Sequence, residues 1–215
     1  MKTLFYNVMF FNHKTKKISG DIALFNLEDW WTSSFSEAER EHIVEVFQPL
    51  GAPKNILVEG DFKHTGDERP LMFLSSLASW FDNIKDRYLA YKIIEKAEEY
   101  VRLEKNIIDK HFFWPTKARI FYGDRDDPVA LQKVIDACLK SIAMAEDAAE
   151  AFKKQFHDHV LPSHTCYERL CIIYEKQGKY EEVIRLAKQA KLQGWNGDWD
   201  VRIKRCEKKI NNKPA

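Results

Sequence analysis

The sequence lacks a charge excess of either sign, since its 215 residues carry 34 Lys and Arg, 33 Asp and Glu, and a formal net charge of +1. Proteins that bind long polyphosphates usually carry a clear positive excess, so the composition of the whole chain does not favour such a partner. The charge is nevertheless uneven along the chain. Residues 176–213 contain 11 Lys or Arg against 5 Asp or Glu, a net charge of +6.

Cysteine is scarce and is not arranged in closely spaced pairs. The four cysteines are Cys138, Cys166, Cys171 and Cys206. They form no CxxC motif, and each lies within or beside an apolar helical stripe, which favours buried free thiols over disulfide bonds. Free thiols are typical of proteins in a reducing compartment, so we expect a cytoplasmic protein.

Long hydrophobic runs are also missing. No stretch approaches 18 consecutive apolar residues, so we expect no membrane-spanning helix and no membrane partner. Residues 4–11 are largely apolar, but Asn7 interrupts them and the basic stretch HKTKK follows instead of a small-residue cleavage site. We therefore expect no signal peptide.

Recognisable catalytic motifs are absent. The sequence contains no glycine-rich phosphate-binding loop, no G-x-S-x-G elbow and no HExxH motif, so we assign no catalytic residue and no cofactor. The densest set of potential metal ligands consists of His157, Asp158, His159, His164 and Cys166. No second cluster follows at the spacing of a zinc finger, so a polar loop between helices explains this stretch better than a metal site.

The sequence does contain enough apolar residues for a sizeable core, with 45% apolar and 28 aromatic residues. Near the N-terminus, residues 3–11 and 17–25 are rich in aromatic and β-branched side chains and flank a polar turn. This pattern predicts a short β-hairpin or an extended arm. Ser36 and Glu39 then form a capping box, which predicts a helix of about three turns that ends near Pro49.

In the rest of the chain apolar residues recur at helical spacing almost without a break. One such stripe consists of Ile107, Ile108, Phe112, Ala118, Phe121 and Tyr122. Pro115 should bend or restart the helix that contains it, and Asp127 and Pro128 predict the start of another helix. The predicted fold class is mainly α, with an irregular region over 1–69 and a domain of stacked antiparallel helix hairpins over 70–215.

One stretch of this domain carries a more specific pattern. The residues of a first helical face are Tyr167, Leu170, Cys171 and Tyr174. Those of a second are Tyr180, Val183, Ala187 and Ala190. Large residues would meet small ones between two antiparallel helices, and Gly178 stands where the first helix should end.

This stretch resembles a tetratricopeptide repeat, whose pattern is W-x2-L-G-x2-Y, then an alanine and an aromatic, then a proline. Tyr replaces the Trp of the pattern and Cys171 replaces the Gly, while Val183, Ala187 and Trp195 depart from its later alanine, aromatic and proline. Two upstream segments fit more loosely, at intervals of 52 and 41 residues. The resemblance implies a stack of about three hairpins, which a helix from Trp199 would cap.

The resemblance also implies a function. In this family the first helix of each hairpin lines a concave groove that contacts ligands, so we expect a non-catalytic binding or scaffold protein whose groove contacts a protein, a peptide or a small ligand. The candidate groove contacts are Ser75, Ser79, Asn83, Glu168, Arg169, Ile172 and Lys176. Chaperone-binding members hold a peptide carboxylate with a lysine and asparagine clamp, which this chain lacks.

The basic C-terminal segment leaves an alternative open. Its lysines and arginines could neutralise the phosphates of a nucleic acid, while Trp195 and Trp199 could stack on bases. A solvated lysine-rich surface over buried tryptophans explains the same residues more simply. Self-association is a further possibility, through Trp30 and Trp31 or through the expected N-terminal strands.

Overall fold

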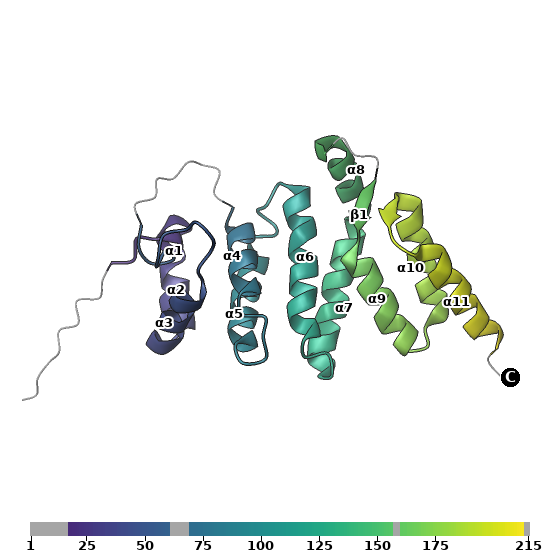
Figure 1. Ribbon diagram of the computed structural model, residues 1–215, viewed down its shortest axis with the longest axis horizontal. Helices are drawn as coiled ribbons and strands as arrows, with labels where there is room; N and C mark the ends of the chain where they lie inside the picture. Colours follow the sequence, from purple (N-terminus) through teal and green to yellow (C-terminus); the bar gives the residue numbers. More distant parts are fainter. Residues whose placement is uncertain (1–16, 61–68, 157–159, 213–215) are drawn as a thin grey trace, which may run out of the picture. The chain divides into compact units, whose positions relative to one another are not determined.

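The computed structural model describes residues 17–60, 69–156 and 160–212 (Figure 1). The chain forms two compact units, Met1–Glu68 and Arg69–Ala215, called here the N-terminal unit and the C-terminal unit. Most of the described residues are helical, which confirms the mainly α fold class. Within the described ranges, no helix combines the length and the apolar character needed to cross a membrane.

The described residues of the N-terminal unit, 17–60, contain three helices, α1 (Asp21–Leu24), α2 (Glu28–Ser34) and α3 (Glu37–Val46). The predicted capping box is confirmed, since the Ser36 hydroxyl accepts from the Glu39 backbone and the Glu39 carboxylate accepts from the Ser36 backbone. The core of this unit consists of Ile22, Leu27, Trp31, Phe35, Ile43, Phe47 and Leu57. These side chains hold the three short helices together, because helices of this length are not stable alone.

The expected N-terminal β-hairpin is not formed by the residues that the structure describes. Residues 3–11 lie outside the described part of the chain, and the latter half of 17–25 forms α1 instead of a strand. The backbone N–H groups of Asp21 and Ile22 donate to the carbonyls of Ile56 and Leu57, so this segment pairs with a distant loop. The prediction of a second strand was therefore wrong, because the partner backbone comes from much later in the sequence.

The C-terminal unit consists mainly of helices that follow one another in chain order (Figure 1). The helices are α4 (Pro70–Ser79), α5 (Arg87–Glu99), α6 (Ile107–Tyr122), α7 (Pro128–Ala143), α8 (Ala145–Phe156), α9 (Thr165–Lys176), α10 (Tyr180–Gln193) and α11 (Trp199–Asn211). Neighbours in sequence pack together in the pairs α4–α5, α6–α7 and α9–α10. The first helices of successive pairs also touch, α4 against α6 and α6 against α9, and α11 packs against α10.

Two predicted helix signals can be compared directly with the structure. Asp127 caps α7, because its carboxylate accepts the backbone N–H of Val129, and Pro128 opens the helix. The expectation at Pro115 was that the helix should bend or restart; α6 runs through Pro115 as one helix, so the restart was wrong, and the bend stays a prediction. Phe113 and Ala118 are buried on either side of the proline, and their packing offsets the loss of one backbone hydrogen bond.

The stretch from Tyr167 to Ala190 forms two packed helices, as its pattern predicts. Gly178 adopts φ +71° just after α9, the left-handed conformation that glycine tolerates best. Tyr167 is fully buried against α10, and its hydroxyl donates to the Gln193 side chain at 3.0 Å. The small residues of α10 that face α9 are buried as well.

The connections around α9 and α10 include a short parallel pairing of β1 (Leu161–Ser163) with β2 (Trp195–Asn196). Trp199, the first residue of α11, is buried, and its indole N–H donates to the Trp195 carbonyl at 2.7 Å. Asp198 precedes α11 but makes no side-chain capping bond. All four cysteines are free and buried, which confirms the expected thiol state.

Candidate functional site

The predicted groove contacts on α4 occupy three different environments. Ser75 is buried, and its hydroxyl donates to the Leu71 carbonyl at 2.6 Å. Ser79 is exposed, and its hydroxyl donates to the Ser75 carbonyl and accepts from Arg119 of α6, both at 3.0 Å. Asn83 lies beyond the helix end, where its carbonyl oxygen accepts from the backbone of Lys85. Ser79 is therefore the member of this group that is best placed to meet a ligand.

A small pocket lies between α4 and α6, the first helices of two successive pairs. Its volume is about 150 Å³. Its lining residues are Met72, Ser75, Ser76 and Ser79 from α4 and Phe112 and Thr116 from α6. The structure thus brings two predicted contacts, Ser75 and Ser79, to one apolar pocket with a polar edge.

Phe112 is the lining residue whose burial the sequence pattern predicted wrongly. The helical spacing put it in a buried stripe with Ile108, but its side chain is 47% exposed. One edge packs against Phe152 of α8, with ring centroids 5.8 Å apart, and the residue also lines the pocket beside α4. No signal in the sequence distinguishes it from a core residue, because the helical spacing is the same for both.

A network of ion pairs fixes one end of this pocket. Arg119 pairs with Asp82, and the Arg87 guanidinium lies 3.5 Å from the same Asp82 carboxylate. Arg87 also pairs with Asp124, which accepts the hydroxyl of Tyr91. Burial, together with the hydrogen bond to Asp124, raises the pKa of Tyr91. The network links the ends of α4, α5 and α6, so that Arg119 presents a fixed donor beside Ser79.

The predicted contacts on α9 do not form one continuous surface. Ile172 is 40% exposed and Lys176 is exposed in the last turn of the helix, while Glu168 and Arg169 are half-buried. The Arg169 guanidinium stacks over the ring of Tyr122, 4.8 Å from its centroid. Arg169 therefore contributes to the packing of α9 against α6, and Ile172 is the clearer candidate for an external contact.

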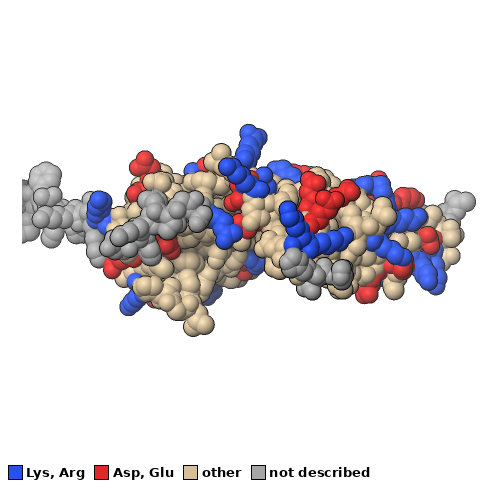
Figure 2. All heavy atoms as spheres, turned by 90° about the horizontal axis from the view of Figure 1, so that it is seen from above, with Lys and Arg blue, Asp and Glu red and all other residues tan. Residues whose placement is uncertain are grey.

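Several of the residues that suggested a nucleic-acid surface in the basic C-terminal segment are buried or paired with acidic side chains. Trp195 and Trp199 are buried and are not available to stack on bases. Arg202 and Arg205 both pair with Glu175, and Lys191 pairs with Asp200 at 2.7 Å. Figure 2 shows basic and acidic side chains interspersed over the visible face of this end of the chain, so the positive excess is dispersed.

The metal-ligand candidates do not come together among the described residues. His157, Asp158 and His159 lie outside the described part of the chain, while His164 and Cys166 are buried. The Nδ1 atom of His164 accepts the backbone N–H of Tyr167 and so caps α9. Over the described ranges, no group of three His, Cys, Asp or Glu side chains is placed to hold a metal ion.

Comparison of the chain with protein-family models, with curated proteins and with solved structures finds no match. The candidate site therefore rests on its geometry alone.

Proposed function

We propose that the C-terminal unit is a tetratricopeptide-like, non-catalytic binding domain that holds an apolar side chain of a partner protein or peptide between α4 and α6. The observation that carries this proposal is the pocket in which Phe112 stands half exposed beside Met72, with Ser79 and Thr116 at its edge. An exposed aromatic ring in a concave site is typical of a surface that a partner covers.

The size of the pocket supports a side chain as its occupant. A volume of about 150 Å³ is close to that of one large apolar residue and is too small for a cofactor. Burial of such a side chain would contribute about 2 kcal/mol. The Ser79 hydroxyl and the Arg119 guanidinium lie next to each other at the rim, where they could meet a peptide carbonyl or carboxylate.

The arrangement of the helices supports the family resemblance that the sequence suggests. Three pairs of consecutive helices, contact between their first helices, and a final helix packed on the last pair are the features that a tetratricopeptide stack requires. In such a stack the first helices α4, α6 and α9 line the groove, so Ile172 of α9 belongs to the same proposed surface as Ser79.

A pocket-filling variant tests the proposal. Ser76 lines the pocket and is exposed, so Ser76→Trp should block it without changing the core. Random peptides are first selected against the wild-type protein, and the affinities of the selected peptides are then measured for each variant. We expect Ser76→Trp to weaken binding about tenfold, which is the loss of about 1.4 kcal/mol.

The matched control is Ala143→Trp, which adds the same side chain at an exposed position of α7 outside the pocket. It should leave peptide affinity unchanged. Ile172→Asp tests the α9 part of the surface and is preferable to a change at Arg169, whose guanidinium packs on Tyr122. Selected peptides that bind Ser76→Trp as well as they bind the wild type would contradict the proposal.

A further inference from the structure

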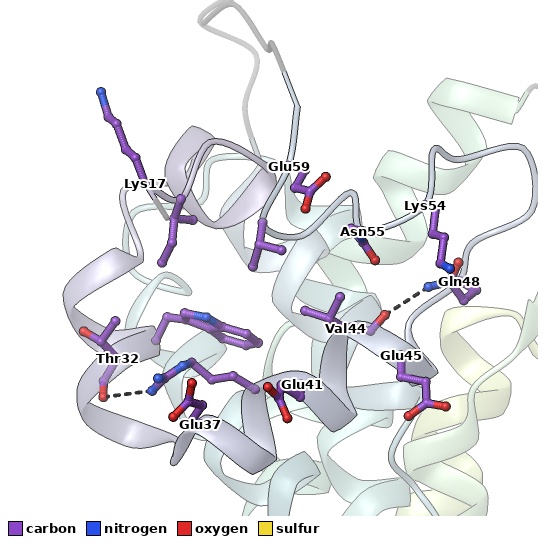
Figure 3. Close-up of a pocket in the computed structure, with 14 residues that line it drawn as sticks. Lys17, Thr32, Glu37, Glu41, Val44, Glu45, Gln48, Lys54, Asn55 and Glu59 are labelled. Carbon is purple, nitrogen blue, oxygen red and sulfur yellow. Dashed lines mark hydrogen bonds between the residues drawn. The ribbon is translucent and has the colours of Figure 1, made fainter. Parts of the chain in front are cut away.

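The N-terminal unit contains a larger pocket, of about 840 Å³, that lies outside the proposed groove (Figure 3). One wall is the exposed side of α3, and the opposite wall is formed by Lys17, Ile18 and the segment from Lys54 to Glu59. Its apolar lining residues are Ile18, Trp31, Val44 and Val58. Trp31 belongs to this lining, although the residue as a whole is only 1% exposed.

The walls of the pocket are held in place by backbone contacts. The Ser19 N–H donates to the Val58 carbonyl at 3.1 Å, and the Asp21 N–H donates to the Ile56 carbonyl at 2.9 Å. Gly20, between them, lies so close to the Ile56 and Leu57 backbone that no Cβ would fit. The two segments therefore form one fixed wall opposite α3, which is what a preformed binding site needs.

The α3 wall carries a row of carboxylates. Glu37, Glu41 and Glu45 follow one another at four-residue steps, so they share one face of the helix and are spaced about 6 Å apart. Within the described residues, none of the three forms an ion pair. Arg40, which lies between them in sequence, donates to the Phe35 carbonyl at 2.6 Å.

The opposite wall does not neutralise this row. Lys17 extends away from the apolar floor in Figure 3, and Lys54 lies at the far end of the pocket near Gln48. The site thus combines an apolar floor with a negatively charged wall about 12 Å long, which is longer than one small cation can span. A fitting partner must present several positive charges at a regular spacing next to an apolar surface.

We propose that this pocket binds a basic amphipathic helix of a partner protein. Lysine or arginine side chains at positions i, i+4 and i+8 of such a helix repeat at the same spacing of about 6 Å as the three glutamates. The adjoining apolar stripe of the helix would cover the half-buried side chains of Ile18, Val44 and Val58, in the manner of a helix in a groove. The proposal is independent of the groove between α4 and α6, because it concerns different residues in the other unit.

The test uses the full chain and a fluorescent synthetic helix of about 14 residues with Lys at i, i+4 and i+8 and Leu on the adjoining face. A scrambled peptide of the same composition is the control probe. We expect the amphipathic peptide to bind about tenfold more tightly than the scrambled one, and its affinity to fall as salt is raised. Equal binding of the two peptides would overturn the proposal.

Two variants place the binding in the pocket. Replacing Glu37, Glu41 and Glu45 with Gln should weaken binding of the amphipathic peptide about tenfold. Replacing Glu150, Glu181 and Glu207 with Gln removes the same charge at exposed positions of the C-terminal unit and should leave binding unchanged. Val44→Ser should also weaken binding, and thermal unfolding shows whether each variant is folded. An equal loss from both triple variants would overturn the proposal.

Other occupants of the pocket would give distinct results. If the chain's own basic N-terminal stretch fills it, the full-chain variant Lys14→Glu, Lys16→Glu would bind the peptide about tenfold more tightly. If a second copy fills it, sedimentation would show an oligomer that the Glu37, Glu41 and Glu45 variant loses. Either result would identify another occupant of the pocket and overturn the proposed binding of a partner helix.

Discussion

His111 of α6 and His164 at the N-cap of α9 lie with their ring centroids 4.9 Å apart and their planes at 80°. Trp195 stacks in parallel on His111 at 5.2 Å and stands perpendicular to His164. Both histidines are buried. Within the described residues, His111 Nδ1, His164 Nε2 and Trp195 Nε1 are buried without a hydrogen-bond partner. This aromatic cluster joins α6, α9 and the short β2 strand, and within the described residues no carboxylate pairs with either imidazole ring.

Acid should destabilise the C-terminal unit through these two histidines. Burial lowers the pKa of His111 to about 4 and that of His164 to about 3, while the ordinary pKa is 6.5. The unfolded chain therefore binds more protons, and stability falls as the pH drops from about 6.5 toward these lower values. At pH 5 each histidine should cost about 2 kcal/mol of unfolding free energy, measured by urea titration.

The matched variant is His111→Phe, which keeps an aromatic ring against Trp195 but cannot titrate. It should remove about half of the decrease in unfolding free energy between pH 7 and pH 5. His164→Asn, which keeps a capping acceptor for Tyr167, should remove the remainder. An unchanged pH dependence in both variants would show that the histidines are not the source.

Asp21 should make the N-terminal unit more stable as the pH falls, whereas the two histidines make the C-terminal unit less stable. Burial raises its pKa to about 6, above its usual value, so the folded state binds the proton more readily than the unfolded state. Its unfavourable contribution at pH 7 should therefore diminish as the pH falls through 6. Because the group is only half-buried, Asp21→Asn should stabilise the unit at pH 7 by about 1 kcal/mol. Hydrogen exchange of the Ile22 amide at pH 7 and pH 5 would measure this difference.

Removal of the Glu98 carboxylate should destabilise the C-terminal unit. It pairs with Lys117 and Lys140, and Lys117 is buried. Burial alone would raise the pKa of Glu98, but the hydrogen bonds from the two lysines outweigh it and the pKa is lowered. Glu98→Gln leaves the Lys117 ammonium buried without its partner, so we expect a loss of about 2 kcal/mol.

The control for this prediction is Glu95→Gln, which removes one exposed partner of Lys133. Its cost should stay below about 0.5 kcal/mol, because exposed ion pairs contribute little. Denaturant unfolding of both variants gives the comparison. Equal losses would mean that the burial of Lys117 does not matter.

Substitution of glycine by alanine should destabilise the protein more at Gly20 than at Gly123. A Cβ at Gly20 would overlap the Ile56 and Leu57 backbone, which cannot move without opening the N-terminal unit. A Cβ at Gly123 would overlap the Arg87 guanidinium, which can swing away at the expense of its pair with Asp124. Gly20→Ala should therefore cost about 3 kcal/mol and Gly123→Ala about 1 kcal/mol, as measured by thermal unfolding of the two units.

The four thiols should be unreactive in the folded protein. Each cysteine is buried, which keeps a reagent away from the sulfur, and burial also raises the pKa of Cys171 to about 12, so Cys171 forms little thiolate near pH 8. A thiol reagent such as dithiobis(nitrobenzoate) should label the cysteines slowly under native conditions and all four rapidly in urea. Fast native labelling of Cys206, which lies on the last helix, would indicate that α11 opens readily.

Local signals in the sequence predict individual helices well. The capping box at Ser36, the helix start at Asp127 and the left-handed turn at Gly178 each depend on residues a few positions apart, and all three are confirmed. The hairpin of α9 and α10 follows from the alternation of large and small residues on two facing stripes. The stacking of these helices as a tetratricopeptide-like groove stays a proposal.

Contacts between distant segments are less accessible to sequence reasoning. Residues 17–25 have the composition of a strand, yet they contain α1 because their backbone partners lie at 56–58. Arg169 was predicted to face an open groove, but its guanidinium stacks over the ring of Tyr122, which lies 47 positions earlier in the sequence. No sequence pattern predicted the pocket beside α3, because its walls come from segments that no short motif connects.

The sequence by itself determined the caps of α3 and α7, the turn after α9 and which residues share a helical face, since hydrogen bonds and side-chain spacing within a helix are local. Only the tertiary structure decided which faces are covered. Phe112 and Ile108 lie on the same side of α6, yet one is half exposed and the other is buried, so the neighbouring helices cover that side unevenly. Burial depends on neighbours far along the chain, and the positions of those neighbours are set only when the whole core has packed.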